Sequence, residues 1–103
     1  IYLFREFEIS GVEKEISKQL LRSGTSVGAN ISEAQGSISE ADYIAKIHIA
    51  YQELLETHYW IELLTNTNNI TEEKSKDLEL KITELSKILY SIMKNIKNKK
   101  NPK

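Results

Sequence analysis

The sequence predicts an all-α domain, an antiparallel helical bundle, and three observations carry this prediction. Good helix formers dominate the 103 residues, which include only four glycines and a single proline, Pro102. Apolar residues recur at steps of three and four along three long segments. The length fits one domain. We assign residues 1–97 to the bundle and 98–103 to a lysine-rich tail.

The first long segment predicts a helix over residues 12–35. Ser10 to Glu13 reads as a capping box, in which the hydroxyl and the carboxylate satisfy open backbone amides, so the helix should begin near Val12. Gly36 is the predicted terminator. Ser23 fills a gap in an apolar line formed by Val12, Ile16, Leu20, Val27, Ile31 and Ala34.

The next two segments predict two further helices. Ser37 to Glu40 supplies a second capping box, and the polar cluster Thr65 to Asn69 ends the helix that follows. Thr71 with the two glutamates after it predicts the last helix start. The stripe of the middle helix is Tyr43, Ile47, Ala50, Leu54, Thr57, Ile61 and Leu64. The stripe of the last helix is Leu78, Ile82, Leu85, Leu89, Ile92 and Ile96.

Additional apolar residues widen these stripes beyond what one narrow seam requires. They include Ile44, Tyr51, Leu55, Trp60, Ile88 and Met93. Two explanations stay open: these side chains face a partner subunit, or they complete the core with a helix upstream of Ile1.

Polar residues beside the apolar stripes predict a seam between the first two helices. One line comprises Gln19, Arg22, Ser26, Asn30 and Glu33, and the other comprises Lys46, Ile49, Glu53, Glu56 and Trp60. In antiparallel helices the numbers of facing residues have a nearly constant sum, and one value, about 75, fits four pairs across these lines. We therefore predict that Arg22 bridges Glu53 or Glu56 and that Asn30 lies near Lys46.

Small residues interrupt the first helix at Gly24, Gly28 and Ala29. A glycine inside a helix destabilises it by about 0.5–1 kcal/mol relative to alanine, so we expect favourable packing to compensate. We expect a neighbouring helix or subunit to approach the backbone closely there. The alternative is that an exposed face merely tolerates these glycines.

Catalytic and metal-binding patterns are missing from the sequence, which therefore predicts no enzyme, no cofactor and no small-molecule substrate. A ferritin-like di-iron site needs Glu-x-x-His, but Ala45 and Leu55 stand three residues before His48 and His58. These two histidines are too far apart along one helix to chelate one ion. No cysteine is present, which fits a cytoplasmic protein.

Charge is distributed unevenly along the chain. Residues 1–85 carry eight basic and fifteen acidic side chains, a net of −7, whereas 86–103 carry six lysines and no acid. The acidic body argues against general nucleic-acid binding. The basic end leaves RNA contact open, against the alternative that its lysines complement the helix dipole. The lysines concerned are Lys94, Lys97, Lys99, Lys100 and Lys103.

The runs RSGTSVGANISEAQ and SEADYIAKIHIAYQELLETHYWIELL resemble the bacterial family of proteins encoded in intervening sequences of 23S ribosomal RNA, also called the S23 ribosomal protein family. The resemblance is close over roughly residues 16–65. It implies an up-and-down four-helix bundle whose first helix lies mostly upstream of Ile1. It also implies a ring-shaped homopentamer, and a related group of such rings binds nucleic acid and a reverse transcriptase.

These observations together predict a non-catalytic, self-associating scaffold or adaptor with no membrane-spanning segment. The polar seam and the small residues would then serve packing and assembly, within or between subunits. The alternative is an RNA-binding accessory protein that acts through an oligomeric ring and its lysine-rich end, with RNA or a nucleic-acid-handling protein as partner.

Overall fold

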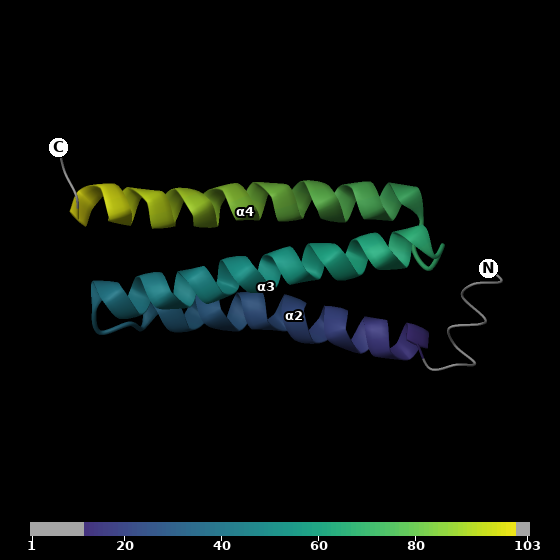
Figure 1. Cartoon of the computed structure of the whole chain (residues 1–103), viewed down its shortest axis with the longest axis horizontal. Helices are drawn as coiled ribbons and strands as arrows, with labels where there is room; N and C mark the ends of the chain where they lie inside the picture. Colours follow the sequence, from purple (N-terminus) through teal and green to yellow (C-terminus); the bar gives the residue numbers. More distant parts are fainter. Residues whose placement is uncertain (1–11, 101–103) are drawn as a thin grey trace.

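The protein is described by a computed structural model that covers residues 12–100, with side chains from 14 to 96. This part of the chain forms three long helices: α2 (Val12–Gln35), α3 (Glu40–Asn66) and α4 (Glu72–Lys100). They run antiparallel, and α3 lies between the other two (Figure 1). The prediction of an all-α fold is confirmed for these residues, and the fourth helix of the expected bundle is not among the described elements.

The C-terminal end of α2 agrees with the predicted one. The helix ends at Gln35, and the amides of Gly36 and Ser37 donate back to carbonyl oxygens of the last turn, each at 3.1 Å. These bonds satisfy acceptors that a helix end leaves open. The predicted cap at Ser10 lies outside the described residues.

The start of α3 corrects one predicted detail. The N-cap is Ser39 and not Ser37: the Ser39 hydroxyl accepts a 3.0 Å bond from the amide of Asp42. Asp42 and Glu40 place acids in the first turn, where the helix dipole favours them. The amide of Ser37 still donates to the end of α2, so the second serine of the predicted box, Ser39, takes the capping role.

The turn between α3 and α4 follows from its polar sequence. Asn68 adopts the left-handed backbone conformation, with φ of 63°, which asparagine tolerates better than most residues. The amide of Asn69 donates to the carbonyl of Leu64 at 2.8 Å and closes the end of α3. Thr71 then caps α4 by accepting from the amide of Lys74 at 3.2 Å, as predicted.

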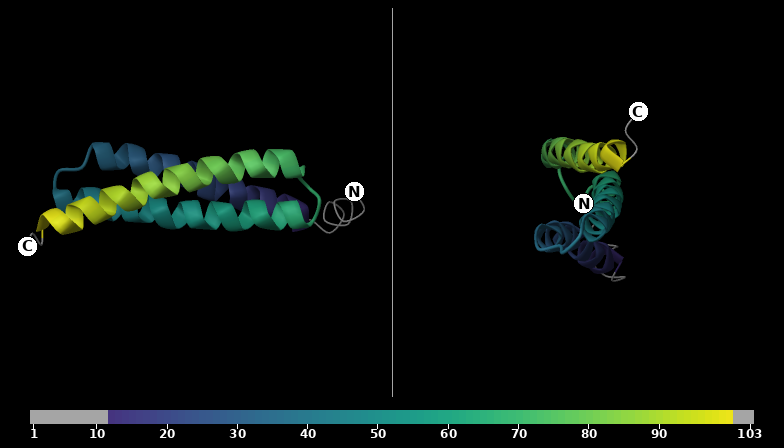
Figure 2. Two further views of the ribbon diagram at one scale, coloured as in Figure 1. Left: turned by 90° about the horizontal axis from the view of Figure 1, so that it is seen from above. Right: turned by 90° about the vertical axis from the view of Figure 1, so that its left-hand side faces the viewer.

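The core lies around α3, because the backbone of α3 runs close to both other helices, whereas the backbones of α2 and α4 stay apart in the described part of the chain (Figure 2). Six of the seven predicted α3 stripe residues are buried, and Tyr43 is half-buried. The central cluster comprises Val27, Ala34, Ile47, Ala50, Leu54 and Leu89. Each helix therefore contributes to one apolar centre.

Helix α4 is less completely covered than the other two helices. Leu89 is the one buried residue of its predicted stripe, and the remaining stripe residues are half-buried. The helix runs to Lys100, so the predicted boundary between bundle and tail at residue 97 falls inside a continuous helix. No helix in the described range is long and apolar enough to span a membrane.

Candidate functional site

The predicted polar seam between α2 and α3 centres on Arg22. Its Nη1 donates to Glu53 Oε2 at 2.8 Å, and its Nη2 donates to Glu56 Oε2. Glu53 and Glu56 are three residues apart on α3, so their carboxylates lie on adjacent turns. One guanidinium fork thus joins two carboxylates of the neighbouring helix, and the structure brings together the three residues that the register paired.

The network extends along both helices from this point. On α2, Arg22 Nε donates to the side-chain oxygen of Gln19, whose amide donates to Glu15, each bond measuring 3.0 Å. On α3, the indole of Trp60 donates to Glu56 Oε2 at 3.0 Å. The Trp60 ring also meets Tyr59 edge to face, with ring centroids 4.9 Å apart. Gln19 therefore reaches the seam through Arg22 and does not pair directly with Glu56.

These contacts shift two ionisation equilibria. Hydrogen bonds to Glu53 and then Glu56 raise the pKa of Arg22 above its ordinary value. The hydrogen bond from Trp60, followed by that from Arg22, lowers the pKa of Glu56 despite partial desolvation. Both shifts favour the charged forms of Arg22 and Glu56.

A buried hydroxyl pair lies in the same interface. The Thr57 hydroxyl donates to the Ser23 hydroxyl at 2.9 Å, and Ser23 donates to the carbonyl of Leu20 at 3.2 Å. Ser23 is fully buried, and Thr57 is nearly so. Both residues belong to the predicted apolar stripes, but their hydrogen bond was not predicted. A polar residue at a core position of each helix was the signal available for this pair.

The second predicted polar contact is made by different partners. Lys46 Nζ pairs with Glu33 Oε1 at 2.9 Å, and this bond raises the pKa of Lys46. Asn30 Nδ2 instead donates to the backbone oxygen and hydroxyl of Ser26, one turn earlier on α2. The prediction that Asn30 is the partner of Lys46 is therefore corrected: a carboxylate one turn further along α2 is the stronger acceptor for an ammonium group.

The small residues of α2 lie on its exposed surface. A Cβ added at Gly24 or Gly28 would have no neighbouring atom within 4 Å, and Ala29 is exposed. No helix of the described chain approaches these glycines, so close helix packing within this part of the chain is not what they serve. Approach by a second subunit stays a prediction.

The lysines of the basic end lie along the last turns of α4. Lys94 is exposed, Lys97, Lys99 and Lys100 fall within the helix bounds, and Lys103 lies outside the described residues. The end of α4 that includes Lys94 lies away from the α3–α4 turn (Figure 1).

The arrangement of the seam suits assembly better than chemistry. Its carboxylates are already paired with Arg22 and Trp60, so neither is poised as a free general base. Depressions at the α3–α4 turn and beside Tyr51 and Tyr90 are open to solvent. The seam instead fixes how α2 lies on α3.

Reversing the charge at Arg22 should destabilise the fold, because Arg22→Glu places a third carboxylate beside Glu53 and Glu56. Combining it with Glu53→Arg should recover part of the loss, which a double-mutant cycle from urea unfolding measures. Lys18→Glu, the same charge change at another exposed position of α2, serves as control and should have a smaller effect. Additive effects of the two seam substitutions would contradict the pairing.

The depressed pKa of Glu56 predicts a pH dependence of stability. Its stabilising contribution is complete above the ordinary pKa of 4.5 in the unfolded chain and is lost as the pH falls through the lower folded value. Glu56→Gln should therefore reduce the free energy of unfolding at pH 7 and have less effect at pH 3. Glu84→Gln, an exposed carboxylate of α4 outside this network, is the control. A Glu56→Gln effect of equal size at both pH values would refute the assignment.

Comparison with known proteins identifies the family of this chain. The family model for "23S rRNA-intervening sequence protein" matches residues 1–97. A crystal structure at 1.70 Å of a protein of unknown function from the S23 ribosomal protein family of Bacteroides thetaiotaomicron VPI-5482 is 46% identical, with a TM-score of 0.77 over 90% of this chain and 83% of that one. Curated proteins give no significant match. Because the family model matches residues 1–97 of the 103-residue chain, the chain belongs to the 23S rRNA-intervening sequence protein family.

Proposed function

We propose that this protein is a non-catalytic, self-associating scaffold or adaptor of the cytoplasm, built as a four-helix bundle. One observation carries the proposal: large apolar side chains are exposed on opposite sides of α4. Ile88 and Tyr90 are 56% and 55% exposed. At 100° per residue, two steps along a helix place them about 160° apart, so one covering helix cannot bury both.

A fourth helix would cover the side of α4 that carries Ile88. Leu85 and Ile92 lie within a turn of Ile88 on the same side and are half-buried. Because the backbones of α2 and α4 stay apart in the described chain, a fourth helix would fit between them and complete the apolar centre. This assignment explains the incomplete burial of the predicted α4 stripe.

The other side suits a second copy of the chain. Tyr90 lies against Tyr51 of α3, with ring centroids 6.3 Å apart, and Leu55 follows Tyr51 by one turn. Leu55 and Tyr59 are about half exposed. We call Tyr51, Leu55, Tyr59 and Tyr90 the tyrosine face. Aromatic-rich exposed surfaces of this kind are typical of protein interfaces, and the family resemblance implies a ring of five subunits.

Charging the tyrosine face should break the assembly. Tyr90→Glu and Leu55→Glu should each lower the mass measured by size exclusion with light scattering toward that of one chain, because a carboxylate cannot be buried there unpaired. Ser91→Glu places the same charge on the next residue of α4, turned by about 100°, and should keep the wild-type mass. Unchanged masses for both tyrosine-face variants would exclude this face as the interface.

A second candidate function is favoured by the charge asymmetry. Residues 86–103 carry six lysines and no acid, and α4 carries most of them on a continuous helix. Repetition of this basic end around a ring would multiply weak phosphate contacts into useful affinity for RNA.

Neutralising the basic end tests this second candidate. Replacing Lys94, Lys97, Lys99, Lys100 and Lys103 with glutamine keeps the length of α4, which a deletion would shorten. If the basic end binds RNA, the wild-type protein should show salt-sensitive affinity in fluorescence anisotropy that the substituted protein loses. The control replaces Lys14, Lys18 and Lys74, which are exposed on the body. Equal RNA affinity before and after substitution of the basic end would exclude it as the contact.

A further inference from the structure

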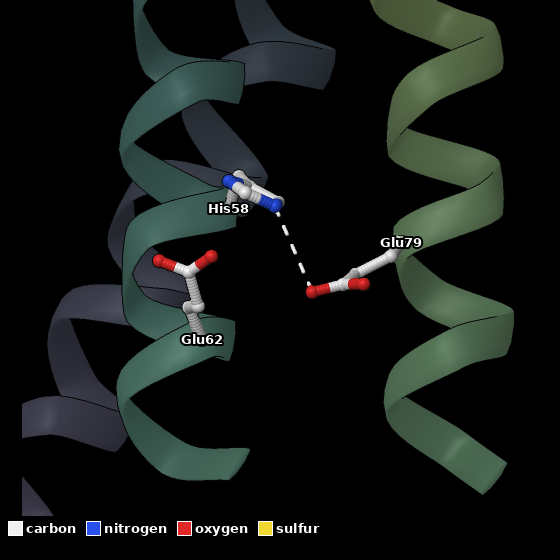
Figure 3. Close-up of side chains that lie close together, drawn as sticks. All are labelled: His58, Glu62 and Glu79. Atoms are coloured by element: carbon white, nitrogen blue, oxygen red, sulfur yellow. Dashed lines mark ion pairs between the residues drawn. The ribbon is translucent and has the colours of Figure 1, made fainter. Parts of the chain in front are cut away.

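Three side chains with metal-binding chemistry converge between α3 and α4. His58 and Glu62 are four residues apart and therefore share one face of α3. Glu79 reaches toward them from α4, and the three side chains point toward one another across the space between the helices (Figure 3). The group lies near the α3–α4 turn, where Thr65 donates to Ser75 at 2.8 Å and holds the two helices together.

The distances suit a single small ion. His58 Nε2 lies 3.7 Å from Glu79 Oε1, and one ligand atom from each of the three residues lies within 4.8 Å of the others. Tetrahedral zinc with bonds of about 2.0–2.2 Å separates its ligands by about 3.3–3.6 Å. Rotation of the exposed Glu62 side chain can close the remaining gap without moving a helix.

The donor set selects the class of ion. Imidazole nitrogen and carboxylate oxygen are both zinc ligands, and catalytic zinc sites combine three such protein ligands with an open position, whereas Ca²⁺ and Mg²⁺ prefer oxygen alone. The 3.7 Å separation is also longer than a hydrogen bond, so the imidazole and the Glu79 carboxylate converge without bonding directly. Two facing carboxylates repel each other, and a divalent cation would compensate both.

We propose that His58, Glu62 and Glu79 bind a divalent transition-metal ion, with Zn²⁺ as the first choice, and that this ion links α4 to α3. Three protein ligands leave a fourth position for water or for a donor from another molecule. The bound ion would fix α4 against α3, and with it the position of Tyr90, the one residue that α4 contributes to the tyrosine face. The sequence alone does not predict this site, because Glu79 is distant from the other two residues in sequence. The four-residue spacing of His58 and Glu62 was the one indication of a shared metal-binding face.

Zinc titration of the untagged full chain, after removal of metal with a chelator, tests this proposal. Competition with a chromophoric chelator should show one Zn²⁺ per chain, and Zn²⁺ should raise Tm because it binds the folded state. Loss of groups that merely support metal ligands costs about 10–100-fold in affinity, so His58→Gln and Glu79→Gln should weaken binding at least about tenfold. His48→Gln and Glu84→Gln are matched controls on the same two helices and should bind as the wild type does.

The design separates loss of a ligand from loss of the fold. Glu62→Gln changes an exposed side chain, so it should retain the wild-type circular dichroism and metal-free Tm while losing Zn²⁺ affinity. Cobalt in place of zinc should show the visible absorption of a four-coordinate ion in the wild type and not in His58→Gln. Zinc binding that His58→Gln leaves unchanged, or no binding stronger than that of Ca²⁺, would overturn the proposal.

Discussion

The two-sided burial of α3 is the constraint on which the rest of the molecule depends. Ile47, Ala50 and Leu54 are almost inaccessible although the backbones of α2 and α4 stay apart. The small Ala50, with no exposed surface, sits at the centre of this arrangement and lets both flanking helices approach. Because each of those helices has only α3 as its partner in the described chain, each retains apolar surface of its own. That remaining surface is the physical reason for expecting both a fourth helix and a second subunit.

The interface of α2 with α3 combines two kinds of polar contact with different consequences. The buried Ser23–Thr57 hydroxyl pair satisfies its own hydrogen bonds within the core, so burial leaves no polar group unpaired there. The Arg22 network lies on the exposed shoulder, where ion pairs add little to stability. Its value lies in selecting a register, because sliding α2 along α3 would place Arg22 away from both carboxylates. Between α3 and α4 the polar contacts of the described residues are fewer, and they lie near the α3–α4 turn.

Much of the fold and of the Arg22 network could be predicted from periodicity and capping chemistry, because both depend on a few neighbouring residues. Local spacing and one register predict the C-terminal end of α2, the α3 stripe and the pairing of Arg22 with Glu53 and Glu56. Predictions failed where side-chain reach or local geometry decided between near neighbours. Lys46 chooses Glu33 over Asn30, and Ser39 caps in place of Ser37. The convergence of Glu79 on His58 needed the register of α3 against α4, for which the sequence offered no comparable set of charge pairs.

The central claim is that the surfaces left open around α3 and α4 are filled by self-association. Native mass spectrometry of the full-length protein, purified without nuclease, tests this claim most directly. The scaffold account predicts one discrete homo-oligomer, of five chains by the family resemblance, that carries no nucleic-acid mass. A single chain at micromolar concentration would contradict it, since the wide apolar stripes would then serve the internal core alone.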